Sequence, residues 1–530
     1  MLLALAEAWE QHRDDLLHDA GQVAALLQSS QESRTPTEKG ALAPETLEAA
    51  YAGLQRAFDE AHGGWGDGPK FPQPMALEFL LRYHATTGDP QALALVTQTL
   101  EAMARGGIYD QLGGGFHRYA VNEDWSVPHF EKMLYDNAQL ARVYLHAWQV
   151  TGEPLFRTVV EETLDYIIRE MTAPEGGFYA TQDADSEGRE GTFFLWTAEE
   201  VTALLGDDAP RFMQAYGVSA KGNFEGRTIL ILKGSFEERQ ALAEARRKLF
   251  LVRTQRPHPG RDAKILTSWN GLMLTAFAEA AQALGREEYR QVAARSAAFL
   301  LDALYRPGGR LWHVWKDDKA RIEGYLEDYT ALIAGLLALY QATFEPRWVA
   351  AAETLAEAMS AHFSATGGFY DTADDAETLL LRPRELQDNA TPSGGSLAAT
   401  VLLGLARLSG EDRYRTLAEE SLVQIQPLAK QYPLAFGQWL IALDDALSAA
   451  TEIALIGVPD HEGTQALLKA LPGGYHPHRL LAVGVGPRPG LLQGRPQIDG
   501  KVTAYLCHGS TCRPPVTEPE ALQALLGQID

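Results

Sequence analysis

Amphipathic segments recur along most of the chain, from Ala43 to about Ala449. In each segment the apolar positions follow the spacing of one helix face, and a short break separates it from the next. The long segments come in pairs, so the pattern predicts helical hairpins. We expect twelve long helices at residues 45–62, 74–87, 91–104, 131–150, 155–171, 268–284, 287–304, 325–342, 346–363, 394–408, 411–427 and 431–449, and shorter ones near 197–205 and 236–250.

Glycine-rich loops that carry aromatic residues follow many of these segments. They read GGWGDG, GGIYD, GGGFHRY, GGFYATQDAD, GGRLWHVW and GGFYDTADD. Because glycine takes positive φ readily, such loops suit a helix end followed by a tight turn and a short strand. The spacing between the loops is irregular, which disfavours an open solenoid of identical repeats. The sequence therefore predicts a mostly α fold, a closed (α/α)6 toroid of six hairpins.

The two ends of the chain differ in pattern from this hairpin region, which we place at 41–449. Residues 1–40 are expected to form a helix over 2–28 and a linker from Gln28 to Gly40, where apolar residues are almost absent. Residues 450–530 alternate strand-like and helix-like runs. This alternation predicts a small C-terminal α/β unit.

The composition, with 46% hydrophobic and 22% charged residues among 530, is typical of a folded, soluble protein. The net charge of −24 disfavours binding to nucleic acid or to an anionic membrane, and no run of about 18 apolar residues is present to span a bilayer. Cys507 and Cys512 are too few for a disulfide scaffold. We therefore expect an incidental thiol pair in a cytoplasmic protein that has no secretory signal.

Several motifs that would indicate a cofactor or a metal are missing from the sequence. The phosphate-binding, dinucleotide-binding, zinc-protease, CxxC and nucleophile-elbow patterns do not occur. We therefore expect neither a cofactor nor a metal ion. Cys507 and Cys512 do not have the spacing of a zinc knuckle.

Polar residues are densest between Asp110 and Leu140. Ser126 can cap the predicted helix and Pro128 fits its first turn, which would place His129 and Glu131 at the positive end of the helix dipole. A neutral His129 would be a competent general base. The alternative is that Glu131 and its neighbours are ordinary helix-stabilising groups.

A second acidic cluster lies in the stretch QDADSEGREGTFFLW. Asp183 and Asp185 would project to the same side of an extended backbone, as a paired-acid site or a calcium loop. The twelfth position of a calcium loop is Phe194 here, where a bidentate glutamate is needed. A polar rim or an acceptor for sugar hydroxyls is the better interpretation.

Three further polar sets precede predicted barrel helices, at the end where an α/α toroid opens its pocket. Each set also has a plain structural interpretation, because such residues cap helices and fill first turns. The sets are Lys264, Trp269 and Asn270; Tyr325, Glu327 and Asp328; and Asp388, Asn389 and Ser393.

The motifs KFPQP, VPHFEKMLYDNAQL, QDADSEGREGTFFLWT, KILTSWNGLM, YLEDYTAL and NATPSGGS resemble those of one family over essentially the whole chain. It is the family of thioredoxin-domain-containing proteins related to spermatogenesis-associated protein 20 and bacterial YyaL. The resemblance implies a thioredoxin-like domain followed by a barrel of the six-hairpin glycosidase and sugar 2-epimerase kind. The thioredoxin-like part and its cysteines are missing here, and residues 1–28 look like its last helix, so no thiol–disulfide exchange is expected.

These features predict a carbohydrate-active enzyme with a small carbohydrate substrate and no particular oligomeric state. Isomerase or 2-epimerase chemistry needs a base, a neighbouring acid and no metal. His129 would be the base, Glu131 or Asp328 the proton donor, and tryptophans the stacking floor. The predicted substrate-binding residues are Lys70, Phe71, His117, Arg118, Trp125, Trp196, Lys264, Trp269, Asn270, Tyr325 and Asn389.

Two alternatives stay open. A glycoside hydrolase would use two facing carboxylates from the set Glu131, Asp183, Asp185, Glu327 and Asp328. A scaffold that binds a carbohydrate or a protein without turning it over would instead hold its histidines and acids in salt bridges.

Overall fold

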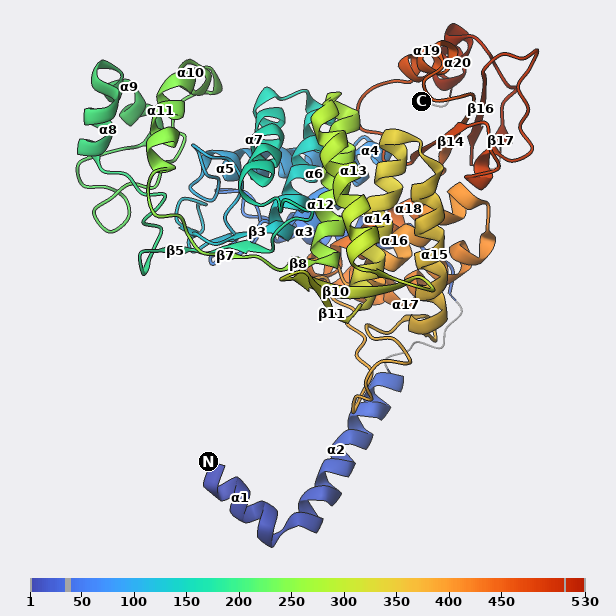
Figure 1. Ribbon diagram of the computed structural model, residues 1–530, viewed down its shortest axis with the longest axis horizontal. Helices are drawn as coiled ribbons and strands as arrows, with labels where there is room; N and C mark the ends of the chain where they lie inside the picture. The colour runs from blue at the N-terminus through green and yellow to red at the C-terminus, as the bar shows by residue number, and fades with distance from the viewer. Residues whose placement is uncertain (1, 34–39, 510, 529–530) are drawn as a thin grey trace.

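The computed structural model describes residues 2–33, 40–509 and 511–528. Within these ranges, six inner helices form a closed ring, because each contacts the next and the last contacts the first (Figure 1). Leu77, Leu332 and Leu402 are fully buried in its core. The inner helices are α4 (Pro74–Thr87), α6 (Leu134–Thr151), α12 (Thr267–Leu284), α14 (Leu326–Thr343), α16 (Gly394–Ser409) and α18 (Gly437–Leu447).

An outer helix precedes each inner one and packs on the outside of the ring. The first outer helix, α3, contacts both α17 and α18, so the start of the ring meets its end. The predicted (α/α)6 toroid is therefore confirmed. The outer helices are α3 (Glu45–Arg56), α5 (Pro90–Arg105), α7 (Pro154–Glu170), α13 (Glu287–Ala303), α15 (Pro346–Phe363) and α17 (Asp412–Gln431).

The turns between hairpins follow simple backbone rules. Glycines with positive φ end α4, α6, α12 and α16 at Gly88, Gly152, Gly285 and Gly410, as expected for a residue without a Cβ. Proline is the first residue of α5, α7 and α15, where its missing N–H costs no helix hydrogen bond.

Two asparagines fix glycine–aromatic loops to the inner helices. Asn270 Oδ1 accepts the N–H of Phe178 at 2.7 Å, and its Nδ2 donates to the Phe178 carbonyl at 3.0 Å. Asn137 on α6 makes the same pair of contacts with Phe116, at 2.7 and 3.1 Å. Both asparagines are fully buried. Asn270, a predicted substrate-binding residue, thus has its amide engaged by backbone groups.

The Asn270→Ala variant is expected to lower the free energy of unfolding by about 1–3 kcal/mol, because the Phe178 N–H and carbonyl lose their partner. Urea unfolding followed by tryptophan fluorescence measures the change. The exposed Asn389 offers a matched control, for which Asn389→Ala should change stability by less than about 0.5 kcal/mol. Equal unfolding midpoints for the two variants would contradict this role of Asn270.

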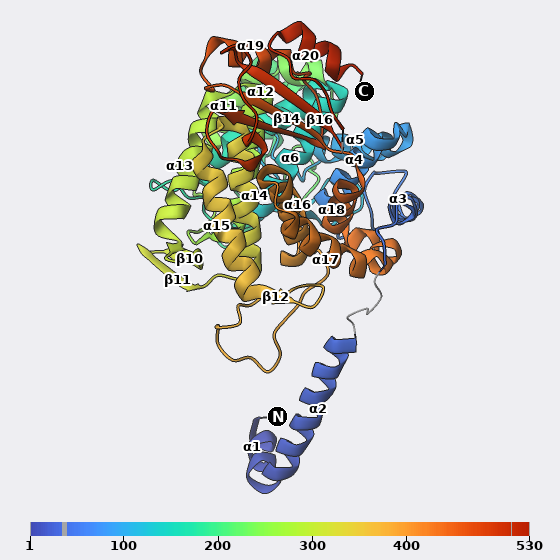
Figure 2. The same ribbon diagram turned by 90° about the vertical axis from the view of Figure 1, so that its right-hand side faces the viewer.

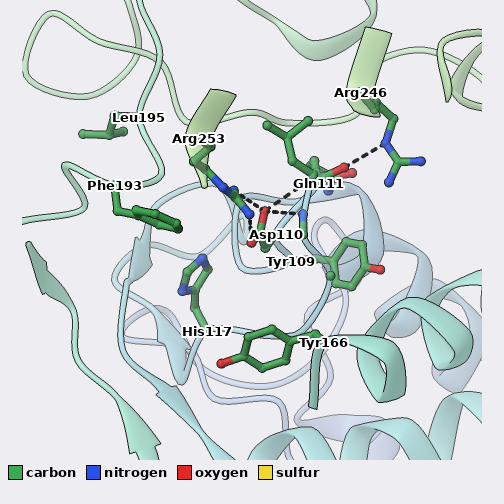
Figure 3. Close-up of polar contacts among 12 residues, drawn as sticks. Tyr109, Asp110, Gln111, His117, Tyr166, Phe193, Leu195, Arg246 and Arg253 are labelled. Carbon is green, nitrogen blue, oxygen red and sulfur yellow. Dashed lines mark hydrogen bonds and ion pairs between the residues drawn. The ribbon is translucent and has the colours of Figure 1, made fainter. Parts of the chain in front are cut away.

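A helical insert lies between α7 and α12. It contains α8 (Ala198–Leu205), a 3₁₀ turn η1 (Gly206–Asp208), α9 (Ala209–Tyr216), α10 (Phe236–Ala241) and α11 (Ala243–Arg253). The single helix predicted at 236–250 is therefore two helices, and α9 was not predicted. Arg253 ties the insert to the barrel through two hydrogen bonds to Asp110, at 2.7 and 2.8 Å (Figure 3).

Short strands line the ends of the inner helices where the chain enters them. Pro128 and His129 pair with Ala120 and Tyr119 in an antiparallel bridge, and α6 begins only at Leu134. The prediction that a helix starts before His129 is therefore wrong, since this backbone is extended and hydrogen-bonded across strands. The strands are β1 (Tyr119–Ala120), β2 (Pro128–His129), β3 (Lys132–Met133), β4 (Thr181–Gln182), β5 (Asp185–Ser186), β6 (Arg189–Glu190), β7 (Arg261–Asp262), β8 (Ile265–Leu266), β9 (Tyr305–Arg306), β10 (Arg310–Lys316), β11 (Lys319–Glu323), β12 (Ser364–Ala365) and β13 (Gly368–Phe369).

The C-terminal residues form a small mixed sheet in the order β15-β14-β16-β17, with β14 parallel to β15 and antiparallel to β16. Cys507 and Cys512 form a disulfide between β16 and β17. The expected incidental thiol pair is thus wrong, because strand pairing brings the two residues face to face. The elements are β14 (Thr451–Ile456), α19 (Glu462–Ala470), β15 (Arg479–Gly484), η3 (Gly490–Leu492), β16 (Thr503–His508), β17 (Thr511–Cys512) and α20 (Pro519–Leu526), and a 3₁₀ turn η2 (Pro433–Ala435) precedes α18.

An N-terminal arm of two helices, α1 (Leu2–Gln11) and α2 (Arg13–Ser33), projects from the molecule. Figures 1 and 2 place this arm and the C-terminal unit at opposite ends. The linker predicted from Gln28 begins inside α2, and residues 34–39 lie outside the described ranges. Among the described helices, none has both the length and the apolar character needed to cross a membrane.

Candidate functional site

The inner helices enclose a lumen of about 270 Å³. Its walls are largely apolar, with amide and hydroxyl groups from Gln139, Thr275, Thr400 and Gln438. The described residues that line it include no tryptophan. Charged side chains close the end of the lumen at which the inner helices finish. They are Glu78, Arg82, Arg142, Glu279, Arg407 and Asp445.

Helix spacing extends the lining of the lumen to its mouth, where the inner helices begin. On α14, Ala334, Leu337 and Gln341 line the lumen, and Glu327 lies on the same face, seven residues before Ala334. On α12, Trp269 lies one turn before the lining residue Leu272 and therefore on the same helix face. Tyr135 and Trp269 meet edge to face at 4.7 Å between ring centres. Helix spacing therefore places Glu327 and the aromatic pair of Tyr135 and Trp269 at the mouth.

Asp328 and His313 form a hydrogen-bonded pair next to this acid. The carboxylate of Asp328 is fully buried and lies 2.9 Å from His313 Nδ1. It also accepts the N–H groups of Ser268 and Tyr325, at 3.0 and 2.8 Å. A partner on Nδ1 fixes the orientation of an imidazole and leaves Nε2 for a ligand.

The ionisation of Glu327 and His313 is shifted by their surroundings. Burial raises the pKa of Glu327 to about 7, and the charges of Asp328 and Asp371 add to this effect while His313 opposes it. Burial alone would lower the pKa of His313, but the hydrogen bond and the charge of Asp328 raise it above its ordinary value. Glu327 therefore titrates near neutral pH, as an acid–base catalyst requires, and His313 keeps its proton to a higher pH than a free imidazole does.

The same three side chains are also the clearest set of metal ligands at the mouth. Donor atoms of His313, Glu327 and Asp328 lie within 4.8 Å of one another. The oxygens of Asp328 are, however, already engaged by His313 and two backbone N–H groups. This donor set suits proton transfer better than metal binding.

His129 and Glu131, the predicted base and acid, lie in a separate group of ion pairs. His129 Nδ1 is 2.8 Å from Glu190, and its Nε2 is 3.7 Å from Glu131. Glu131 also accepts from Arg118 at 3.1 Å. Arg118 also lies close enough to Tyr135 at the mouth for its charge to oppose the rise in the pKa of that phenol. His129 and Glu131 are thus both held by charged partners.

Two of the three tryptophans predicted to stack on a sugar lie in the protein interior. Trp125 is fully buried and donates its indole N–H to the His62 carbonyl at 3.0 Å. Trp196 is also fully buried, and the guanidinium of Arg256 covers its ring at 4.0 Å. The predicted stacking floor is therefore wrong for both, because protein atoms cover their faces. Trp269 is half-buried at the mouth.

The other predicted residues are spread over several environments. His117 is buried, and its pKa falls to about 3 through burial and the charge of Lys132. Lys70 is buried and lies 2.5 Å from Asp59. Four of the remaining residues are exposed at the surface, namely Phe71, Asp183, Asp185 and Asn389. Tyr325 and Lys264 are also exposed, but they lie beside the mouth, because the Tyr325 ring contacts His313 edge to face at 5.0 Å and the charge of Lys264 acts to lower the pKa of His313.

The sequence pattern did not indicate the role of His313, and it gave no chemical role to two buried acids near inner-helix starts. Burial raises the pKa of Asp136 well above its ordinary value, and its Oδ2 has no hydrogen-bond partner among the described residues. Asp388, which belongs to one of the polar sets that precede barrel helices, accepts Ser396 Oγ at 2.6 Å, and burial raises its pKa to about 6. The aromatic-rich run LWHVW is typical of a strand, and it is the signal that could have placed His313.

Comparison with known proteins gives full-length relatives. No family model matches the chain. Human spermatogenesis-associated protein 20 is 31% identical over 592 residues, which covers 99% of this chain and 75% of the relative. An uncharacterized protein of Caenorhabditis elegans is 28% identical over 575 residues, covering 98% and 78%. Among solved structures, cellobiose 2-epimerase from Bacillus thermoamylovorans is 9% identical and covers 73% of this chain and 87% of its own, with a TM-score of 0.47.

Proposed function

This chain belongs to the family of spermatogenesis-associated protein 20, and we propose that its barrel is a carbohydrate-active enzyme that moves protons at the carbon beside a sugar carbonyl. The observation that carries the proposal is the Glu327–Asp328–His313 group at the mouth of the lumen. A carboxyl with a pKa of about 7 and an oriented imidazole are the two groups that enolisation requires.

Each side chain has one role in this scheme. The Glu327 carboxylate takes the proton from C2 of the sugar, while the imidazolium of His313 donates a proton to the carbonyl oxygen, which gives an enediol. Return of a proton to C1, with loss of the O2 hydroxyl proton to His313, gives the ketose isomer. Return of a proton to the opposite face of C2, with loss of the O1 hydroxyl proton to His313, gives the epimer. Asp328 positions His313 and stabilises its charge. The catalytic roles of His129, Glu131, Asp183 and Asp185 stay predictions.

The substrate is a small carbohydrate in this proposal. The aromatic pair of Tyr135 and Trp269 supplies an apolar face at the mouth, as sugar rings require. Gln139, Thr400 and Gln438 supply polar groups for hydroxyls inside the lumen. We also propose that the protein is cytoplasmic. The chain would divide into three units, at residues 1–40, 41–449 and 450–530.

Proton exchange in D₂O tests this function directly. A panel of mono- and disaccharides is incubated with the protein, and NMR follows the loss of the C2 proton signal together with any new sugar. We expect exchange at C2 of at least one aldose, or at C1 of the corresponding ketose. Tight binding of a sugar with neither proton exchange nor any new product would contradict an enzyme and favour the binding scaffold.

The pH dependence of kcat/KM should be bell-shaped with its rising limb near pH 7. The carboxylate of Glu327 is the active form, so the rate falls as the pH drops below its pKa of about 7. The imidazolium of His313 is the active form of the second group, so the rate falls again above its raised pKa. Rates measured between about pH 5 and 9 check this. A profile that decreases steadily through pH 7 would reverse the assignment of Glu327.

Glycoside hydrolysis is the second candidate, and Asp371 favours it. Its charge contributes to the raised pKa of Glu327, and burial raises its own pKa. Most glycosidases use two carboxyl groups that flank the bond to be cleaved. Release of a new reducing end from oligosaccharides, without C2 exchange, would select this function.

A further inference from the structure

A second hollow, of about 730 Å³, lies at the end of the barrel opposite the mouth. Its walls come from the last turns of α6, α12 and α14, from the start of α13, and from the C-terminal segment 471–481. We name it the far chamber. We propose that the far chamber binds a small anionic metabolite through its phosphate or carboxylate group.

The charge of the chamber walls is opposite in sign to that of the chain. Six cationic side chains line the chamber against four acids, although the whole chain has a net charge of −24. A local positive wall in an acidic protein attracts anions selectively. The cations are Arg82, Arg142, His146, Arg286, Arg290 and Arg479, and the acids are Glu78, Glu279, Glu287 and Asp460.

Two acids of the chamber, the buried Glu78 and the half-buried Glu279, are already paired with protein groups. His146 Nδ1 lies 2.8 Å from Glu78, and its Nε2 lies 3.4 Å from Glu279. Both ring nitrogens therefore face carboxylates, and these charges raise the pKa of His146 to about 9 against its burial. Tyr475 of the C-terminal segment donates to Glu78 at 2.7 Å. Neither acid is left to repel an anion.

Guanidinium donors stay available at this floor. Arg142 uses Nε and Nη2 on Glu279, at 2.6 and 2.9 Å, while its Nη1 makes no hydrogen bond within the described part of the chain. The Nε of Arg82 has no hydrogen-bond partner there, although it lies 3.6 Å from Glu78 in an ion pair, and Nη1 of Arg82 donates to Asp444 at 3.4 Å. Planar guanidinium groups bind carboxylate and phosphate strongly. The ends of three inner helices carry partial negative charge, which these cations offset.

The remaining polar walls suit hydroxyl groups. Gln149, Gln282, Gln465 and Thr343 add amides and a hydroxyl around the charged floor. The volume lies within the range of ordinary metabolite pockets. A polyhydroxylated anion, either a sugar phosphate or a sugar acid, therefore combines both features. The chamber shares its charged floor, Glu78, Arg82, Arg142 and Glu279, with the lumen. None of its lining residues belongs to the Glu327 group, so this inference does not depend on the proposed catalysis.

Calorimetric titration of the full chain tests the site. Glucose 6-phosphate and glucuronate represent the two sources of negative charge, and glucose and inorganic phosphate separate the sugar from the anion. We expect at least one of the charged sugars to bind about tenfold more tightly than glucose. Binding by glucose 6-phosphate alone identifies a phosphate site, and binding by glucuronate alone identifies a carboxylate site. Equal affinity for glucose and both anions would overturn the proposal.

Variants locate the binding in the chamber. Arg142→Gln should weaken the anion at least about tenfold. Because it also leaves Glu279 without its arginine, the exposed pair Arg286→Gln with Arg290→Gln gives a milder second test, expected to weaken binding about threefold. Arg295→Gln on the same helix α13, outside the chamber, is the matched control. If both test variants bound the charged sugar with the affinity of the parent protein, the proposed site would be excluded.

The Glu327→Gln variant separates this site from the mouth. It should bind the charged sugar with parent affinity even if it loses all turnover. Loss of binding in Glu327→Gln alone would place the ligand at the mouth and overturn the far chamber. Protection of segment 471–481 from hydrogen exchange by the ligand would support it.

Discussion

Replacing Glu327 by glutamine is expected to lower the rate of C2 proton exchange by about 10²–10⁴-fold, the contribution of one positioned acid–base group. Glutamine keeps the shape of the side chain and cannot take up a proton at neutral pH. The loss should appear in kcat more than in KM, because the substrate still binds. NMR exchange rates with the best sugar of the panel measure it.

Glu323 offers a matched control for this variant. It lies four residues away, near the end of β11, where it pairs with Arg306 near the surface. Glu323→Gln should leave the exchange rate within about twofold of the parent. A Glu327→Gln variant with parent activity would exclude Glu327 as the base. His313→Gln should show a comparable loss and should also remove the upper limb of the pH profile.

The Asp110→Ala variant is expected to destabilise the fold by about 3–5 kcal/mol, the typical effect of removing one partner from a buried ion pair. Asp110 lies at the centre of the contacts in Figure 3, where it receives both guanidinium N–H groups of Arg253. It also lies 3.0 Å from Lys132. The variant leaves two buried cations next to each other, without their counter-ion. Urea unfolding measures the change.

The control for this variant is an exposed ion pair in the insert that carries Arg253. Glu244 and Arg247 are largely exposed neighbours on α11, so Glu244→Ala should cost less than about 1 kcal/mol. Lowering the pH should also destabilise the fold through protonation of Asp110. Arg253 and Lys132 hold the pKa of Asp110 well below its ordinary value despite its burial. Its contribution is complete above the ordinary carboxyl pKa and is lost as the pH falls through the lowered one.

The ring of hairpins could be predicted because it depends on local information. Apolar spacing located α14 and α16 to within about two residues, and the glycines after α4 and α6 marked where these helices end. The start of α6 could not be found in this way. Pro128 and Ser126 fit a helix start as well as a turn, and only pairing with Tyr119 on a distant strand decides for the extended form.

Only those residues of the mouth that depend on local sequence could be predicted. Glu327 and Asp328 were recognised because they stand at the start of an inner helix, where acids are common. Their partner His313 lies on β10, which pairs with β8 and β11, so its position depends on contacts between strands. Burial of Trp125 and Trp196 was equally hidden, since a tryptophan in a glycine-rich loop fits either the core or a binding face.

The contact between α3 and the last hairpin means that the ring can close only after the whole barrel has been synthesised. The Ala43 N–H is held by Gln426 Oε1 across 383 residues of sequence, and Ala50 and Leu54 on α3 are fully buried. During translation α3 leaves the ribosome long before α17 and α18 are made. The apolar face of α3 is therefore exposed until these last helices can pack against it. Nascent chains of this kind need shielding by chaperones until the last helices arrive.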